Sequence, residues 1–141
     1  MADIAVLGAG IMGHGIALVF ALGGHRVRLT DSRAEALVKA PALMASALDT
    51  LREAGEVDAS WTAEKLGQAV RCCASLEETV RGAGVVIEAI TELPEAKRAL
   101  FAEVDPFLGN DAILASNTSY LDVFPLIPAA RQRQALIAHW Y

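Results

Sequence analysis

Short apolar runs alternate with longer segments of helical periodicity along this chain. A short apolar run is typical of a buried strand, and a longer periodic segment is typical of a helix that covers a sheet. Alternation of the two predicts parallel strands joined by crossover helices. We therefore expect an α/β fold, a doubly wound sheet of about six mainly parallel strands, at 4–7, 26–30, 69–73, 85–88, 112–115 and 135–138.

The segments between these strands carry helix signals. Residues 11–22 read as a buried helix, which Gly23-Gly24 would end because glycine tolerates a left-handed cap. Pro94 suits the first turn of a helix that runs to about Val104, since proline needs no backbone donor there.

The connection between the second and third strands is too long for a plain crossover. Apolar residues at helical spacing predict one helix over 34–54 and a shorter one over 62–66, capped by Ser60 or Thr62. We therefore expect residues 34–68 to form a helical hairpin insertion that projects from the sheet.

The chain's most informative motif is a G-x-G-x-x-G between the first strand and the first helix. In that context Gly8 permits a tight turn, Gly10 lets the backbone approach a pyrophosphate, and Gly13 lets helix and strand pack closely. The helix N-terminus then offers amides and a positive dipole end to the phosphates. A glycine turn without a ligand is the alternative. The context favours a Rossmann-type dinucleotide site formed by Gly8, Ala9, Gly10, Ile11, Met12 and Gly13.

Asp31 ends the second strand and bears on the choice of cofactor. A carboxylate there can accept hydrogen bonds from both ribose hydroxyls and would repel a 2′-phosphate, which favours NAD over NADP. Capping of the following helix is the structural alternative for Asp31. Arg33 could favour NADP, although a solvated surface charge is the interpretation we prefer.

Polar residues also follow the fourth, fifth and sixth strands, where ligands of such sheets bind. Oxidation of an alcohol requires a base for the hydroxyl proton, and histidine exchanges protons near neutral pH. His139 stands at the last strand end, and Ser119 could hydrogen-bond the substrate oxygen. The alternatives are a capping or core histidine and an ordinary strand-to-helix turn over 116–119.

Composition narrows the remaining classes. The 141 residues suit one domain, and 54% hydrophobic residues fit a sheet covered on both faces. A net charge of −5 without a basic stripe argues against nucleic acid as a partner. No apolar run is long enough for a membrane span and the start lacks a signal peptide's basic flank, so we expect a cytoplasmic location. The adjacent Cys72 and Cys73 predict neither a disulfide framework nor a metal site.

Four blocks together resemble the N-terminal, NAD-binding domain of the 3-hydroxyacyl-CoA dehydrogenases. In order they are Gly-Ala-Gly-Ile-Met-Gly-His-Gly-Ile-Ala (8–17), Val-Ile-Glu-Ala-Ile-Thr-Glu (86–92) with Lys97, Ala-Ser-Asn-Thr-Ser (115–119) and Ala-His-Trp (138–140). The resemblance spans essentially the whole chain. It implies NAD-dependent oxidation of an L-3-hydroxyacyl-CoA to the 3-ketoacyl product.

The same resemblance implies roles for individual residues. His139 matches the family's catalytic base and Ser119 its substrate-contacting serine, while Glu92, Lys97 and Asn117 fall where the family contacts the cofactor. An acyl-CoA would be the small-molecule substrate, and the full-length protein would be a homodimer. The family's helical substrate and dimerisation domain, and the glutamate paired with the base, fall beyond residues 1–141. We therefore expect this NAD-binding domain to bind cofactor but to be inactive alone.

Two other functions stay open. The 34–68 hairpin, which approaches CoA in the family, has only Lys39, Arg52 and Lys65 as basic residues. A dehydrogenase of a CoA-free hydroxy acid, resembling those for carnitine or gulonate, is therefore one alternative. The other is a non-catalytic nucleotide-binding or structural module similar to the lens crystallins of this superfamily, although Ser119 and His139 favour an enzyme.

Overall fold

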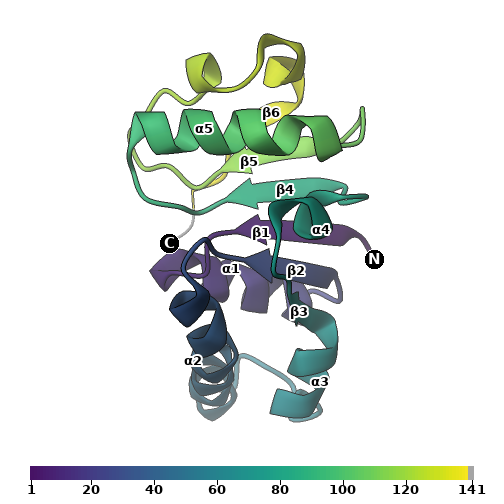
Figure 1. Cartoon of the computed structure of the whole chain (residues 1–141). Coiled ribbons are helices and arrows are strands. Elements are labelled where there is room, and N and C mark those ends of the chain that lie inside the picture. The colour runs from purple at the N-terminus through teal and green to yellow at the C-terminus, as the bar shows by residue number, and fades with distance from the viewer. Residues whose placement is uncertain (140–141) are drawn as a thin grey trace.

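A computed structural model describes residues 1–139 and has one six-stranded sheet at its centre (Figure 1). The strand order is β3-β2-β1-β4-β5-β6, and every neighbouring pair is parallel. The predicted Rossmann-type doubly wound fold is thus confirmed, and each strand end lies within one residue of its predicted position. The strands are β1 Asp3–Leu7, β2 Arg26–Thr30, β3 Val70–Cys72, β4 Val85–Glu88, β5 Ile113–Ser116 and β6 Ala135–Ile137.

The helices follow the predicted pattern with one addition. The five α-helices are α1 Ile11–Leu22, α2 Ala34–Glu53, α3 Ala63–Ala69, α4 Leu76–Val80 and α5 Pro94–Val104, and short 3-10 turns cover Asp105–Phe107, Phe124–Leu126 and Ala129–Gln134. Helix α4 was not predicted from the sequence. Its signal was present, because Ser75 accepts a hydrogen bond from the Glu78 amide as the N-cap of a Ser-x-x-Glu capping pattern.

The sheet separates two hydrophobic cores. Along β1, Ile4 and Val6 face the core shared with α1, α2 and α3, whereas Ala5 and Leu7 face the core that holds Phe101 of α5. Successive strand side chains point to opposite faces, so a continuous apolar run is the pattern expected of a strand covered on both sides. This arrangement places the parallel strand ends, and the loops after them, along one edge.

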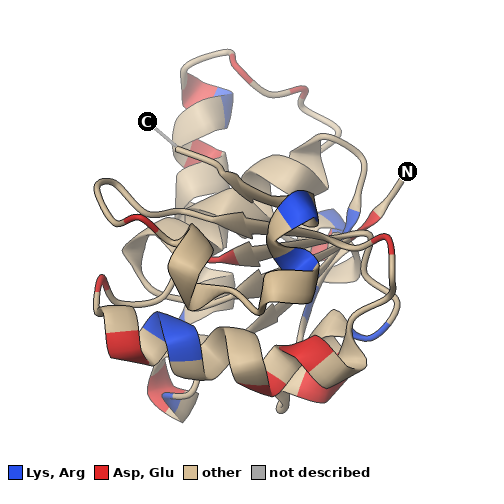
Figure 2. Cartoon of the chain, turned by 90° about the horizontal axis from the view of Figure 1, so that it is seen from above, with Lys and Arg blue, Asp and Glu red and all other residues tan. Residues whose placement is uncertain are grey.

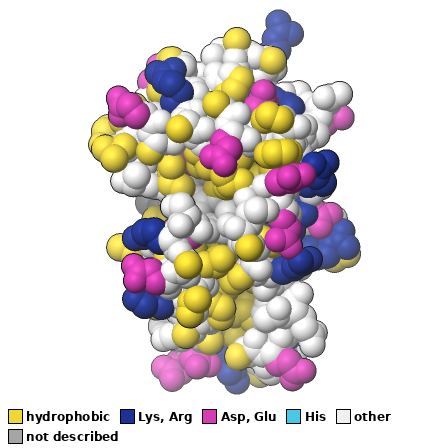
Figure 3. All heavy atoms as spheres, in the orientation of Figure 1, with side chains coloured by type: hydrophobic (Ala, Val, Ile, Leu, Met, Phe, Trp, Pro, Cys, Tyr) yellow, Lys and Arg dark blue, Asp and Glu magenta, His cyan; other side chains and the backbone are white. Residues whose placement is uncertain are grey.

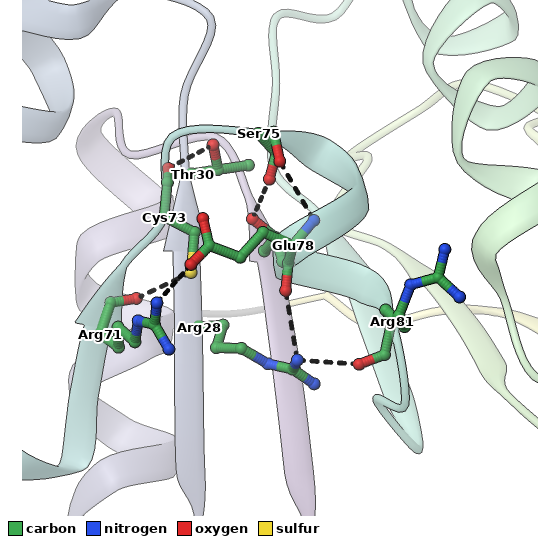
Figure 4. Close-up of polar contacts among 8 residues, drawn as sticks. Arg28, Thr30, Arg71, Cys73, Ser75, Glu78 and Arg81 are labelled. Atoms are coloured by element: carbon green, nitrogen blue, oxygen red, sulfur yellow. Dashed lines mark hydrogen bonds and ion pairs between the residues drawn. The ribbon is translucent and has the colours of Figure 1, made fainter.

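Strand β2 departs from the apolar pattern, and α4 explains why. Arg28 lies on the face that α4 covers, where its guanidinium donates to the main-chain oxygens of Glu78 (3.2 Å) and Arg81 (2.8 Å) (Figure 4). The C-terminal carbonyls of a helix lack partners within the helix, so an arginine on the neighbouring strand satisfies them. The same face of β2 carries Thr30, whose hydroxyl donates to the Cys73 carbonyl.

The expected helical hairpin is formed by α2 and α3. Figure 1 shows both helices at the end of the molecule beyond β2 and β3. Thr62, one of the two candidate caps, accepts a hydrogen bond from the Lys65 amide (3.2 Å) and is the N-cap of α3. The helix then runs to Ala69, three residues past its predicted end at 66, and leads directly into β3.

Charged residues are distributed over several elements. Viewed from above, basic and acidic residues are interspersed without a continuous stripe of either sign on that side (Figure 2). Within residues 1–139, no helix combines the length and apolar character that a membrane crossing requires. Cys72 is exposed and Cys73 is buried, both as free thiols, and the described residues contain no cluster suited to a metal ion.

Candidate functional site

The candidate site lies along the carboxyl edge of the sheet. Strand order reverses between β1 and β4, which is where ligands bind in open α/β sheets. Because all six strands are parallel, the glycine loop after β1, Asp31 after β2, Glu88 in β4 and the 116–119 segment at the end of β5 share this edge. His139 follows β6 at the same edge.

Two of the three motif glycines are required by the backbone around them. Gly8 has φ 108°, and a Cβ there would lie 2.5 Å from the Ala89 carbonyl oxygen. A Cβ on Gly13 would lie 1.7 Å from the carbonyl oxygen of Gly8. Both positions therefore exclude any side chain, and the loop turns tightly against the start of α1.

Gly10 differs, because its side-chain position faces open space. A Cβ there would meet only an Arg33 guanidinium nitrogen, at 3.8 Å, among atoms within 4 Å. Gly10 is the N-cap of α1, and the first turn of this helix, within the described chain, holds no acidic residue. The helix N-terminus thus presents backbone amides and a positive dipole end beside an open cradle, which fits the pyrophosphate of a dinucleotide.

Asp31 connects the end of β2 to the glycine loop. Its Oδ2 accepts the Ala9 amide (2.8 Å), and its Oδ1 accepts the Arg33 amide (2.8 Å) and Nε (3.4 Å). Burial raises the pKa of Asp31, but the hydrogen bonds from Arg33 and Ala9 outweigh it and leave the pKa below its ordinary value. The N-cap of α2 is Arg33, so Asp31 holds the loop rather than capping that helix.

A buried ion-pair network occupies the other half of the site. The Lys97 ammonium lies 2.6 Å from Glu88 Oε1 and 2.9 Å from Glu92 Oε2. Lys97 and Glu88 are fully buried. Glu88 also accepts the Ile90 amide (2.8 Å) and the Ser116 hydroxyl, so both of its oxygens have partners. The network therefore joins the ends of β4 and β5 to the first turns of α5.

Glu92 extends this network to the loop after β5. Its Oε1 accepts the Thr118 hydroxyl and the Ser119 amide, each at 2.7 Å. Burial raises the pKa of Glu92, but the hydrogen bonds from Thr118, Lys97 and Ser119 lower it by a larger amount. The pKa of Glu92 is therefore below its ordinary value. Glu92 is therefore an ionised carboxylate that holds the Thr118–Ser119 turn.

The remaining candidates, Asn117, Ser119 and His139, lie at the same edge of the sheet. Ser119 is exposed and lines a surface pocket with Ile137 of β6. The Asn117 amide donates to the Glu88 carbonyl (2.8 Å), which ties the β5 end to β4. The Ala138 amide donates to the Ser116 carbonyl (2.9 Å), which ties the end of β6 to β5, and His139 follows as an exposed residue. Trp140 of the fourth sequence block lies outside the described residues.

The sequence singled out Glu88, with Glu92, among the polar residues at strand ends but assigned it no specific role, and the structure makes it the centre of the buried network. The signal was a charged residue at the end of an otherwise apolar strand. A buried carboxylate needs a compensating partner, and the sequence alone did not identify Lys97, nine residues later, as that partner.

A family profile described as 3-hydroxyacyl-CoA dehydrogenase, NAD binding domain, matches residues 3–141. The chain belongs to this family. It is 29% identical over 138 residues to lambda-crystallin of Oryctolagus cuniculus, covering 97% of this chain and 43% of that protein. It is 36% identical over 133 residues to the fatty acid oxidation complex subunit alpha of Ectopseudomonas oleovorans, covering 94% and 18% respectively.

Solved structures agree with this membership. The (S)-3-hydroxybutyryl-CoA dehydrogenase of Ralstonia eutropha superposes with a TM-score of 0.87 at 26% identity, covering all of this chain and 50% of that one. This member of the family is therefore an NAD-binding domain with a Rossmann-type fold, as its sequence predicted. It spans half or less of the length of these relatives.

Proposed function

We propose that this domain is the cofactor-binding part of an enzyme that oxidises an L-3-hydroxyacyl-CoA to the 3-ketoacyl-CoA. The observation that carries the proposal is the placement of Ser119 and His139 beyond β5 and β6, at the edge that also holds the glycine loop. A domain that only bound a nucleotide would need no base and no hydroxyl at the far end of this crevice.

Residues at different strand ends take different roles in this proposal. The glycine loop and the α1 N-terminus bind the pyrophosphate, and Asp31 faces the adenosine ribose while it holds the loop. Bound NAD supplies the hydride acceptor. Ser119 hydrogen-bonds the substrate oxygen, and His139 accepts the hydroxyl proton as that oxygen becomes a carbonyl.

The assigned base is tested in the full-length protein. Replacement of His139 by Gln should lower kcat by about 10² or more and leave the affinity for NADH near its parent value, as is typical of an acid–base residue. Stopped-flow turnover of 3-hydroxybutyryl-CoA and a fluorescence titration with NADH measure the two quantities. Near-parent turnover in His139→Gln would remove His139 from the mechanism.

A second candidate substrate is a CoA-free hydroxy acid, and the charge of the hairpin favours it. Residues 34–69 contain the acidic Glu35, Asp49, Glu53, Glu56, Asp58 and Glu64 and the basic Lys39, Arg52 and Lys65. Figure 3 shows acidic side chains on both sides of a basic one at the end of the molecule where α2 and α3 lie. Such a surface offers little attraction to the phosphates of CoA.

A substrate panel on the full-length protein separates the candidates. The acyl-CoA proposal expects kcat/KM for 3-hydroxybutyryl-CoA to exceed that for free hydroxy acids, including 3-hydroxybutyrate and gulonate, by tenfold or more. The reverse order supports the second candidate. Cofactor binding without turnover of any member of the panel would indicate a binding module instead.

We further propose that the complete protein is a cytoplasmic homodimer in which a second domain closes the substrate crevice. The length of the relatives supports the second domain, because they are about twice as long as the chain or longer. Light scattering of the full-length protein should give twice the subunit mass, and a monomer would contradict the proposal.

A further inference from the structure

The half of the site built by β4, β5 and α5 contains a cation that is sealed from solvent. The side chain of Lys97 is 1% exposed, and that of Glu88 is fully buried. Taking charges out of water is costly even when they are paired, so a buried pair is weak evidence for stability and better evidence for a specific arrangement. Because its ammonium is covered by protein, Lys97 acts on a bound ligand through the groups that it contacts.

We propose that Lys97 is a positioning residue: anchored by Glu88, it holds the Glu92 carboxylate against the Thr118–Ser119 turn and so sets the place of the Ser119 hydroxyl. The kinetic part of this inference rests on the proposed function. The structural part, from Lys97 to the Ser119 amide, does not.

The contacts form a continuous path from the core to the site. Lys97 binds Oε2 of Glu92, which leaves Oε1 to accept both the Thr118 hydroxyl and the Ser119 amide. Thr118 in turn accepts the Leu121 amide (3.0 Å), so the turn is held on both sides of Ser119. A change at Lys97 is therefore transmitted to Ser119 through one carboxylate.

Loss of the cation would leave two carboxylates facing each other. Glu88 and Glu92 share Lys97 as the cation between them, and like charges in one site oppose ionisation of both. Glu92 is the partner that can respond, because its side chain is 28% exposed. Without Lys97 it would take up a proton or turn toward solvent, and either change weakens its hold on the turn.

The first experiment follows the Ser119 amide by NMR in the chain itself. Because this amide donates to Glu92, its resonance should titrate with that carboxylate. In Lys97→Met the midpoint should rise by about one pH unit or more, the usual effect of removing an adjacent opposite charge. Arg98→Met is the matched control, since it removes the next cation on α5, whose partner is the Pro125 carbonyl. An unchanged midpoint in Lys97→Met overturns the proposal.

Two further variants test the proposal if Lys97→Met does not fold. Glu88→Gln/Lys97→Met removes both fully buried charges together, which is less costly than removing one. Its midpoint should lie above that of the parent but below that of Lys97→Met, because the Glu88 charge is removed as well. Glu92→Gln leaves the Glu88–Lys97 pair intact and should abolish the titration of the Ser119 amide. A Ser119 resonance that titrates as in the parent in Glu92→Gln contradicts the inferred path.

Kinetics of the full-length protein then separate positioning from general instability. Lys97→Met and Glu92→Gln should each lower kcat by about tenfold or more, because misplacement of a substrate contact acts on the chemical step. Val104→Ala, a core substitution on the same helix, should lower stability and leave kcat unchanged. A fall in kcat in Val104→Ala equal to that in Lys97→Met overturns the positioning role. If the unsubstituted full-length protein shows no turnover, the proposed function is wrong. The NMR titration then decides the role of Lys97.

Discussion

The two halves of the site hold their loops by different means. In the β1-α1-β2 half, glycines make the turn and Asp31, at the end of β2, ties it down through the Ala9 amide. In the β4-α5-β5 half, side chains do this work, since Glu88 and Glu92 accept loop amides and Lys97 neutralises them from the core. One half is shaped by the absence of side chains, the other by charged ones.

This difference decides what each half can offer a ligand. The glycine half leaves the amides at the start of α1 without a side-chain cap, so they can receive an anionic group. The ionic groups of the charged half bind one another and the Thr118–Ser119 turn, where Glu92 accepts the Thr118 hydroxyl and the Ser119 amide. Because the two halves share no contact of this kind in the described part of the chain, substitutions should be able to disturb the glycine loop and the Thr118–Ser119 turn separately.

The largest effect should come from adding one methyl group to the glycine half. In Gly13→Ala the new Cβ would lie 1.7 Å from the Gly8 carbonyl oxygen, so strand and helix must separate. NADH affinity should fall by about 10² or more, with a lower Tm. Gly15→Ala is the control on the same helix, because outside the adjacent backbone of α1 no atom lies within 4 Å of its Cβ position. It should be neutral or raise stability by about 0.5–1 kcal/mol. Parental affinity in Gly13→Ala would show that the loop can open without loss.

Removal of one buried charge tests the other half. Glu88→Gln leaves Lys97 with Glu92 alone, and we expect a loss of about 3 kcal/mol in the free energy of unfolding measured in urea. The matched control is Glu78→Gln, which breaks the exposed pair with Arg71 drawn in Figure 4. Exposed pairs contribute about 0–1 kcal/mol, so the two losses should differ clearly. Equal losses would mean that the network around Lys97 is no more demanding than a surface pair.

Replacement of Asp31 tests how the glycine half binds the cofactor. Asp31→Ala removes the acceptor of the Ala9 amide and the negative charge at the ribose end. NADH affinity should fall by about tenfold, the equivalent of 1.4 kcal/mol, and the preference over NADPH should narrow. Titrations of both nucleotides measure this, with Asp49→Ala on α2 as a control of equal charge change. Equal affinities for NADH and NADPH in the parent would contradict the role of Asp31.

The smallest effect should be the shared response of the two halves to acid. The pKa values of Asp31 and Glu92 lie below their ordinary values in the folded chain. Their stabilising contribution is therefore complete above about pH 4–4.5 and is lost as the pH falls through the lowered values. The Tm of the parent should decline below this range, and Asp31→Asn should decline less steeply. A parent whose Tm is constant down to about pH 3 would contradict both assignments.

Much of the first half was determined by the sequence alone. The apolar runs predicted all six strands, because a sheet covered on both faces needs continuous hydrophobic strands. The glycine spacing located the loop, since glycine is the one residue without a Cβ to clash at Gly8 and Gly13. The helical hairpin followed from segment length and helical periodicity.

Only the tertiary structure decided how the second half works. The residues of the Lys97 network come from 88–119 but meet only when β4, β5 and α5 pack. No local sequence pattern indicates which carboxylate a lysine will face. The resemblance placed Lys97 near the cofactor, and the fold shows in addition that it is buried and paired with Glu88 and Glu92. Local rules such as turn sterics act within a few residues, so the sequence reveals them. Compensation of a buried charge depends on which elements enclose it, and that is settled only when the chain has folded.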